Sequence, residues 1–141
     1  MTGTARALLD TNILVYAAAG RDHPAKQARA LELLEQDGVG LCAQVMHEFY
    51  NVVTRKVKPP LAPAVAMQWL DELEAFPRVE LDADTVRDGA ELSDRYGIQY
   101  WDGALLAAAH RLGASVMYSE DLNHGQTYGS VRVVNPFKHD A

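Results

Sequence analysis

Acidic side chains follow two predicted strands, and their positions indicate one shared site. Asp10 comes directly after the apolar run predicted as a strand over Ala5–Leu9. Asp121 comes just after a second predicted strand, Ala114–Tyr118. In an open parallel sheet, ligands bind beyond the carboxyl ends of the strands. If these two strands are neighbours, both carboxylates lie at the same edge of the sheet.

Two further acids lie at the margins of apolar helix faces. Glu48 borders the apolar stripe of the helix predicted over Val45–Lys56. Asp102 opens the helix predicted over Asp102–Leu112 and is in register with its apolar positions. The backbone N–H groups at a helix start favour a carboxylate. Both carboxylates are therefore expected near buried surface rather than on an open solvent face.

Each acid also has an ordinary structural explanation. Asp10 and Asp102 could cap the helices that they precede. Asp121 could be a turn residue, and Glu48 could pair with a cation at the end of its helix. Taken together, however, carboxylates at one edge would repel one another and raise their pKa values unless positive charge lay between them. Mg²⁺ supplies such charge and binds few carboxylates, together with waters and substrate phosphate oxygens.

The elements that must position these acids alternate along the chain. Strands are predicted over Ala5–Leu9, Gly40–Ala43, Val79–Leu81, Ala114–Tyr118 and Val131–Val134. Helices are predicted over Asn12–Ala18, His23–Gln36, Val45–Lys56, Pro63–Phe76, Ala83–Tyr96 and Asp102–Leu112. This interleaving predicts a three-layer α/β/α fold around a central, mostly parallel sheet. The segment Lys56–Ala64, with two adjacent prolines, is expected to connect helices.

Composition limits the class of protein. A chain of 141 residues with 48% hydrophobic residues fits one globular domain spanning residues 1–141. No apolar run approaches the roughly 18 residues of a membrane span, and the N-terminus lacks the pattern of a signal peptide. The single cysteine, Cys42, excludes an internal disulfide, so we expect a cytoplasmic protein. The net charge of −6 argues weakly against nucleic-acid binding, but an acidic site can coexist with a local basic face.

Four motifs in order resemble those of PIN-domain nucleases, and in particular the VapC toxins of bacterial toxin–antitoxin pairs. They read "LLDTNILVY", "QVMHEFYNVVTRK", "YWDGALLAAA" and "SEDLNHG…VRVVNPF", and the likeness extends from about Leu8 to Phe137. Any one motif is weak, but their order and strand–helix context are specific. The resemblance implies a small α/β/α endoribonuclease that uses Mg²⁺ or Mn²⁺ to hydrolyse RNA phosphodiester bonds.

The resemblance also assigns roles by position. The catalytic, metal-binding acids would be Asp10, Glu48, Asp102 and Asp121. Glu120 is an alternative to Asp121 as the fourth acid. Asn12 and Ser119 match the small polar residues expected to orient the cluster.

Substrate and partners are less defined by the sequence. Arg55, Lys56 and His124 are candidate contacts to RNA. Aromatic residues at helical spacing more often pack in a core or an interface, and this role is favoured for four residues that could otherwise stack on bases: Tyr16, Tyr50, Tyr100 and Trp101. For a toxin, the resemblance implies a small antitoxin whose C-terminal segment blocks the acidic site, a homodimer, and no membrane association.

Three alternatives remain open at this point. The first is a PIN nuclease of RNA maturation with no toxin role, and the second is a PIN fold used only for binding. The third is an acidic phosphotransfer module or phosphatase on a similar sheet. A phosphatase of that type requires D-x-D after the first strand, where this chain has Asn12 as the second polar residue.

Overall fold

Six strands form one sheet whose order brings the first strand to the centre. The computed structural model describes residues 4–138, and its strand order is β3-β2-β1-β4-β6-β5. The strands are β1 (Ala7–Leu9), β2 (Val39–Cys42), β3 (Arg78–Val79), β4 (Val116–Tyr118), β5 (Thr127–Tyr128) and β6 (Val131–Val134). All neighbours are parallel except β5 and β6. The predicted α/β class with a mostly parallel sheet is therefore confirmed.

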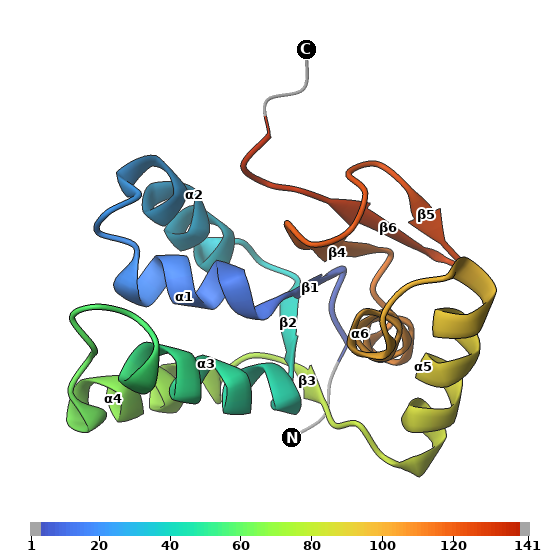
Figure 1. Cartoon of the computed structure of the whole chain (residues 1–141), viewed down its shortest axis with the longest axis horizontal. Coiled ribbons are helices and arrows are strands. Elements are labelled where there is room, and N and C mark those ends of the chain that lie inside the picture. Colours follow the sequence, from blue (N-terminus) through green and yellow to red (C-terminus); the bar gives the residue numbers. More distant parts are fainter. Residues whose placement is uncertain (1–3, 139–141) are drawn as a thin grey trace.

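Helices cover both faces of this sheet (Figure 1). They are α1 (Thr11–Ala19), α2 (Pro24–Glu35), α3 (Ala43–Arg55), α4 (Pro63–Leu73), α5 (Ala83–Tyr96) and α6 (Tyr100–Leu112). The first four lie on one side, and α6 packs on the opposite face with α5 outside it. No helix within residues 4–138 is both long and apolar enough to cross a membrane. The single-domain prediction also included residues 1–3 and 139–141, which lie outside the described part of the chain.

The pairing of β1 with β4 decides where the functional side chains meet. Leu9 is in register with Tyr118, and the Asp10 N–H donates to the Tyr118 carbonyl oxygen at 3.1 Å. All three residues of β1 are buried, as expected of a strand covered on both faces. The two strands are therefore neighbours, which is the condition for their carboxyl ends to share one edge.

Two features of the fold differ from the sequence prediction: the start of α6 and a short additional strand. Helix α6 begins at Tyr100, with Gln99 as its N-cap, so Asp102 lies within the first turn and does not cap the helix. An additional strand that the sequence pattern does not predict, Thr127–Tyr128, pairs with β6 in a hairpin. A two-residue strand is too short to show an alternating pattern, and its strongest signal was Gly129, whose φ of 62° suits the tight turn.

Two glycines set the approach of α5 to α6. A Cβ added at Gly89 would lie 2.8 Å from the Ala104 Cα atom, and one added at Gly103 would strike the Gly89 carbonyl oxygen. Every residue from Gly103 to Ala109 is buried, because α5 covers the side of α6 that faces away from the sheet. Small side chains along α6 thus hold the first turn, including Asp102, close to the sheet.

Gly103→Ala should destabilise the protein even though alanine is the better helix former. We expect the free energy of unfolding to fall by about 1–3 kcal/mol, because the added methyl group overpacks a backbone contact. Ala90→Gly, at an exposed position of α5, is the propensity control and should cost about 1 kcal/mol. Urea unfolding of both variants measures this, and a Gly103→Ala protein more stable than wild type would contradict the packing argument.

Candidate active site

The Asp10 carboxylate lies at the floor of the site, buried to 4% exposure. Its Oδ1 atom accepts from the Thr11 N–H at 2.7 Å, so Asp10 is the N-cap of α1. Its Oδ2 atom accepts from the Ser119 hydroxyl at 2.7 Å. Each carboxylate oxygen has further lone-pair capacity, so these bonds orient the group without exhausting it as a ligand. Capping and ligation are therefore compatible roles for Asp10.

Ser119 links Asp10 to the loop after β4. Its hydroxyl oxygen accepts from the Asp121 backbone N–H at 3.1 Å while it donates to Asp10. The Asn12 amide donates to Asp121 Oδ1 at 3.4 Å, so Asn12 contacts this second acid of the cluster. Asn12 and Ser119 thus both touch the acidic cluster, as their expected supporting positions require.

Glu120 turns away from Asp10 toward α1 and α2. Its carboxylate accepts from the Lys26 ammonium at 2.7 Å and from the Tyr16 hydroxyl at 2.9 Å. Lys26 also lies over the Tyr16 ring, with its nitrogen 4.9 Å from the centroid. Asp121, by contrast, lies at the cleft itself. Of the two alternatives for the fourth acid, the structure places only Asp121 at the cleft.

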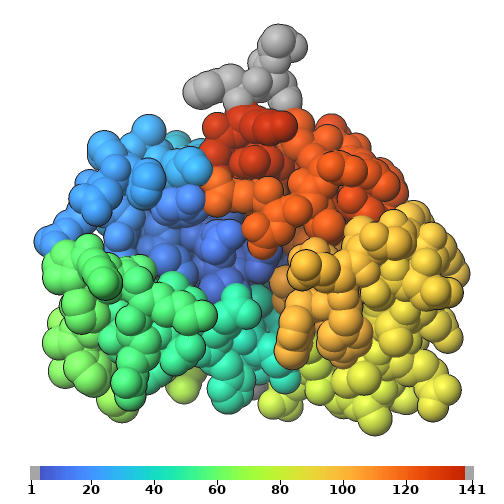
Figure 2. Space-filling view, viewed as in Figure 1, coloured from blue at the N-terminus to red at the C-terminus, as the bar shows by residue number. Residues whose placement is uncertain are grey.

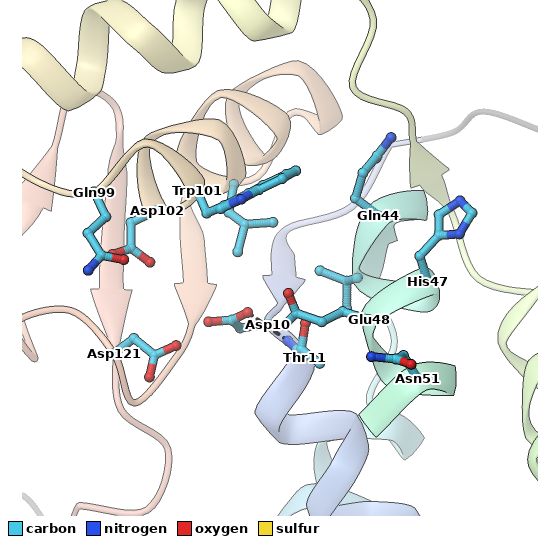
Figure 3. A pocket seen from close by; sticks show the side chains of 12 residues that line it. Asp10, Thr11, Gln44, His47, Glu48, Asn51, Gln99, Trp101, Asp102 and Asp121 are labelled. Atoms are coloured by element: carbon cyan, nitrogen blue, oxygen red, sulfur yellow. Dashed lines mark hydrogen bonds between the residues drawn. The ribbon is translucent and has the colours of Figure 1, made fainter. Parts of the chain in front are cut away.

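Four acids line one cleft of about 570 Å³ at the carboxyl end of the sheet. Asp10 comes from the end of β1, Asp121 from the loop after β4, Asp102 from α6 and Glu48 from α3. Their side chains point into the same space from these separate elements (Figure 3). Figure 2 shows α1, in dark blue, set back between the teal start of α3 and the amber first turns of α6.

The electrostatics of the cleft disfavour its own negative charge. Burial, and to a smaller extent the nearby charge of Asp121, raises the pKa of Asp10 to about 7 against the lowering effect of the bonds from Ser119 and Thr11. Burial, and then the charge of Asp121, also raises the pKa of Asp102. Carboxylates that are costly to ionise in this way gain from a cation between them.

The donor set fits a hard divalent cation that keeps much of its water. Among residues 4–138, no group of three or more His, Cys, Asp or Glu side chains is drawn together closely enough to enclose a metal ion. Mg²⁺ usually binds through one or two carboxylates plus waters and substrate oxygens. A pair such as Asp10 and Asp121 therefore meets its needs, with Asp102 and Glu48 across the same cleft.

The predicted substrate contacts lie outside the cleft lining. Arg55 is exposed in the last turn of α3, and Lys56 caps that helix. His124 accepts a hydrogen bond from the Asn135 N–H at 3.0 Å through Nδ1, which ties its loop to the end of β6. None of these three residues is among those that line the acidic cleft.

Sequence reasoning missed several polar residues of the cleft wall. Gln44 and Asn51 line the cleft from α3 on either side of the predicted Glu48. Their spacing of four and then three residues places them on one helix face, opposite the buried Val45, Phe49 and Val53. That polar stripe was the available signal. Thr11, His47, Gln99 and Trp101 also line the cleft, and only the tertiary structure identifies them as part of it.

Comparison with known proteins assigns the family. The PIN domain sequence model matches residues 7–129. The chain belongs to the PIN domain family. A comparison with curated protein sequences gave no match.

Several solved structures share this PIN fold at low sequence identity. A toxin–antitoxin complex from Klebsiella pneumoniae contains a chain with a TM-score of 0.71 and 18% identity, covering 94% of this chain and 99% of that one. VapC20 of Mycobacterium tuberculosis, a sarcin–ricin-loop-cleaving toxin, has a TM-score of 0.64 and 15% identity, covering 82% and 89%. VapBC2 of Rickettsia felis, bound to a fragment of promoter DNA, gives 0.61 and 19%, covering 90% and 96%.

Asp10→Asn should stabilise the metal-free PIN domain at alkaline pH. Because the pKa of Asp10 is raised from 3.8 to about 7, the folded state holds a proton that the unfolded chain releases. This contribution is complete below about pH 4 and is lost as pH rises through about 7. At pH 8 with chelator, we expect the melting temperature of Asp10→Asn to exceed that of wild type by about 5–10 °C, since 1 kcal/mol corresponds to roughly 2–4 °C.

The difference should shrink toward pH 5, and Mg²⁺ at pH 8 should raise the melting temperature of wild type but not of the variant. Asp82→Asn provides a contrast of opposite sign. Asp82 caps α5, and its bond from the Thr85 N–H lowers its pKa, so losing its charge should destabilise the protein at neutral pH. Calorimetry from pH 5 to pH 8 measures all three proteins. Parallel curves for wild type and Asp10→Asn would show that burial of Asp10 carries no electrostatic cost.

Proposed function

We propose that this PIN domain is a metal-dependent endoribonuclease and the toxin of a toxin–antitoxin pair. One observation carries the proposal: four carboxylates from separate elements line a single open cleft at the carboxyl end of the parallel sheet. Carboxylates of this kind are the ligands that Mg²⁺ or Mn²⁺ would require. Among residues 4–138, no Lys or Arg side chain lines the cleft, so a cation would supply the positive charge for phosphate recognition.

Phosphodiester hydrolysis requires an attacking water, in-line geometry and stabilisation of the leaving oxygen. A divalent cation held by a pair such as Asp10 and Asp121, with Asp102 and Glu48 across the same cleft, would supply the Lewis acidity for these tasks. The protein's own part is placement. Ser119 and Thr11 fix the orientation of the Asp10 carboxylate, and Asn12 holds Asp121 toward the same cleft. An acid of this set that does not bind the cation can accept a proton from the attacking water.

The toxin role and its partners are part of the same proposal. The similar structures named above are toxins or toxin–antitoxin assemblies, and one of them is described as cleaving an RNA loop. We propose a cytoplasmic protein that forms a homodimer and is inhibited by a small antitoxin, whose C-terminal segment places a cation, such as an arginine, in the acidic cleft. Arg55 and Lys56 remain proposed contacts to the RNA backbone beyond the cleft. No observation favours the phosphotransfer alternative over the PIN assignment.

Cleavage of RNA should depend on the cation and on the buried acid. With a mixed panel of RNAs and Mg²⁺ or Mn²⁺, wild type should produce discrete internal cuts, and chelator should abolish them. Asp10→Asn should lower the rate by at least about 100-fold, because loss of the carboxylate charge weakens the binding of the cation that would stabilise the transition state. Product mapping on denaturing gels measures this. Cleavage that is equal in wild type and Asp10→Asn, or unaffected by chelator, would refute the mechanism.

Asp121→Asn and Glu120→Gln form a matched pair that identifies the fourth acid. Asp121 lies in the cleft, so its amide variant should weaken Mn²⁺ binding and lower the cleavage rate by about 10-fold or more. Glu120 is held by Lys26 outside the cleft, so its amide variant should retain the rate within about 3-fold, as expected of a surface ion pair. Titration calorimetry with Mn²⁺ and single-turnover cleavage measure the two effects. The reverse order would assign the role to Glu120.

A further inference from the structure

Trp101 is a large aromatic side chain that is exposed to solvent beside the acidic cleft. It is 59% exposed, although it lies in the first turn of a helix that is otherwise largely buried. Its indole forms part of the cleft wall, immediately before Asp102 in the chain. Packing in a core, the more common role for an aromatic residue at helical spacing, is therefore wrong for Trp101.

The surroundings of Trp101 differ from those of an apolar docking patch. The other large hydrophobic side chains exposed among residues 4–138 lie on other helices: Leu31, Val65, Met67 and Val86. Within the cleft, the indole is accompanied by the polar side chains of Gln44, His47, Asn51 and Gln99 (Figure 3). Protein interfaces are marked by contiguous apolar surface. A single aromatic plane among amides suits a ligand that has a flat face and polar edges.

We propose that Trp101 is the stacking platform for an unpaired base of the RNA strand whose phosphate lies at the carboxylates. This inference rests on the proposed nuclease function and names the part of the substrate that the site holds. Stacking requires a base free of its own neighbours, as in single strands, loops and bulges. Because Trp101 and Asp102 are consecutive residues of one helical turn, the base and the phosphate of neighbouring nucleotides can be held by one rigid element.

Two features support a path for an extended strand past the indole. The Tyr100 ring contacts Trp101 edge-on, with centroids 5.5 Å apart and planes at 62°, which restrains the indole without covering both of its faces. A second open hollow of about 600 Å³, lined by Gly97, Ile98 and Leu122, shares Gln99, Asp102 and Asp121 with the cleft. The two acids thus lie between two hollows, and a strand crossing them would place Trp101 on one side of the reacting phosphate.

Binding can be followed through Trp101 itself. The chain has one other tryptophan, Trp69, which packs against Phe49 with ring centroids 6.5 Å apart, so Trp69→Phe leaves Trp101 as the only indole emitter. In the Trp69→Phe background with Mg²⁺, a 12-nucleotide oligouridylate mixed in a stopped-flow instrument should quench the emission before cleavage products form. A 12-base-pair RNA duplex and a polyphosphate of matched charge should not, because they offer charge but no free base.

Kinetics provide the second readout. Trp101→Ala should raise KM for a single-stranded RNA about 10-fold with kcat within about 3-fold, given the ~1–3 kcal/mol that base–aromatic stacking contributes. Trp101→Phe, which keeps an aromatic face, should restore KM to within about 3-fold of wild type. Met67→Ala removes a comparably exposed apolar side chain, at 56% exposure on α4, and should leave both constants unchanged.

The outcomes separate this inference from the nuclease proposal. Suppose that wild type cuts RNA, that Trp101→Ala leaves KM unchanged and that oligouridylate does not change the Trp101 emission. The stacking platform is then refuted, while the nuclease proposal is retained. If oligouridylate quenches Trp101 but no cation supports cleavage, base binding stands and the nuclease falls. Equal quenching by polyphosphate overturns the inference. The inference is also overturned if the Trp101 emission shifts with protein concentration alone and Trp101→Ala no longer dimerises. That result would assign the indole to an interface between copies of the chain.

Discussion

The parallel pairing of β1 with β4 is the constraint on which the site depends. It brings residue 10 beside the end of β4, where the Asp10 N–H bonds the Tyr118 carbonyl oxygen. The Ser119 hydroxyl then lies within 2.7 Å of the Asp10 carboxylate and also accepts from the Asp121 N–H. Two acids far apart in the sequence become one connected group. Because all of β1 and Met117 of β4 are buried, a slip in their register would break the core as well as the site.

A buried carboxylate at a strand end is a stability cost that the fold accepts. Burial and the charge of Asp121 raise the pKa of Asp10 to about 7, so ionisation of this carboxyl group is unfavourable in the metal-free protein. The neighbouring ion pair shows the contrasting solution, since Glu120 is neutralised by Lys26 on the other side of the same loop. The consecutive residues Glu120 and Asp121 therefore differ in environment: Glu120 is paired with a cation of the protein itself, whereas Asp121 lies at the cleft.

Much of the fold was predictable because its elements have strong local signals. The boundaries of α5 and β6 match the prediction, and the other predicted helices and strands shift by only a few residues. Helix α5 has an aspartate cap at Asp82 and a left-handed glycine stop at Gly97, which explains its accuracy. The start of α6 was misplaced since Gln99 makes no side-chain capping bond. Strand β5 was missed because two residues carry no periodicity.

By itself, the sequence determined which residues carry charge next to apolar runs, and hence the four acids and their order along the chain. It could not decide between Asp121 and Glu120, which are adjacent and chemically alike. Only the tertiary structure distinguishes their environments, because Tyr16 of α1 and Lys26 of α2 bind Glu120. The exposure of Trp101 was decided in the same way. Helical spacing places a side chain on a face, but whether that face meets protein or an open cleft depends on elements distant in the sequence.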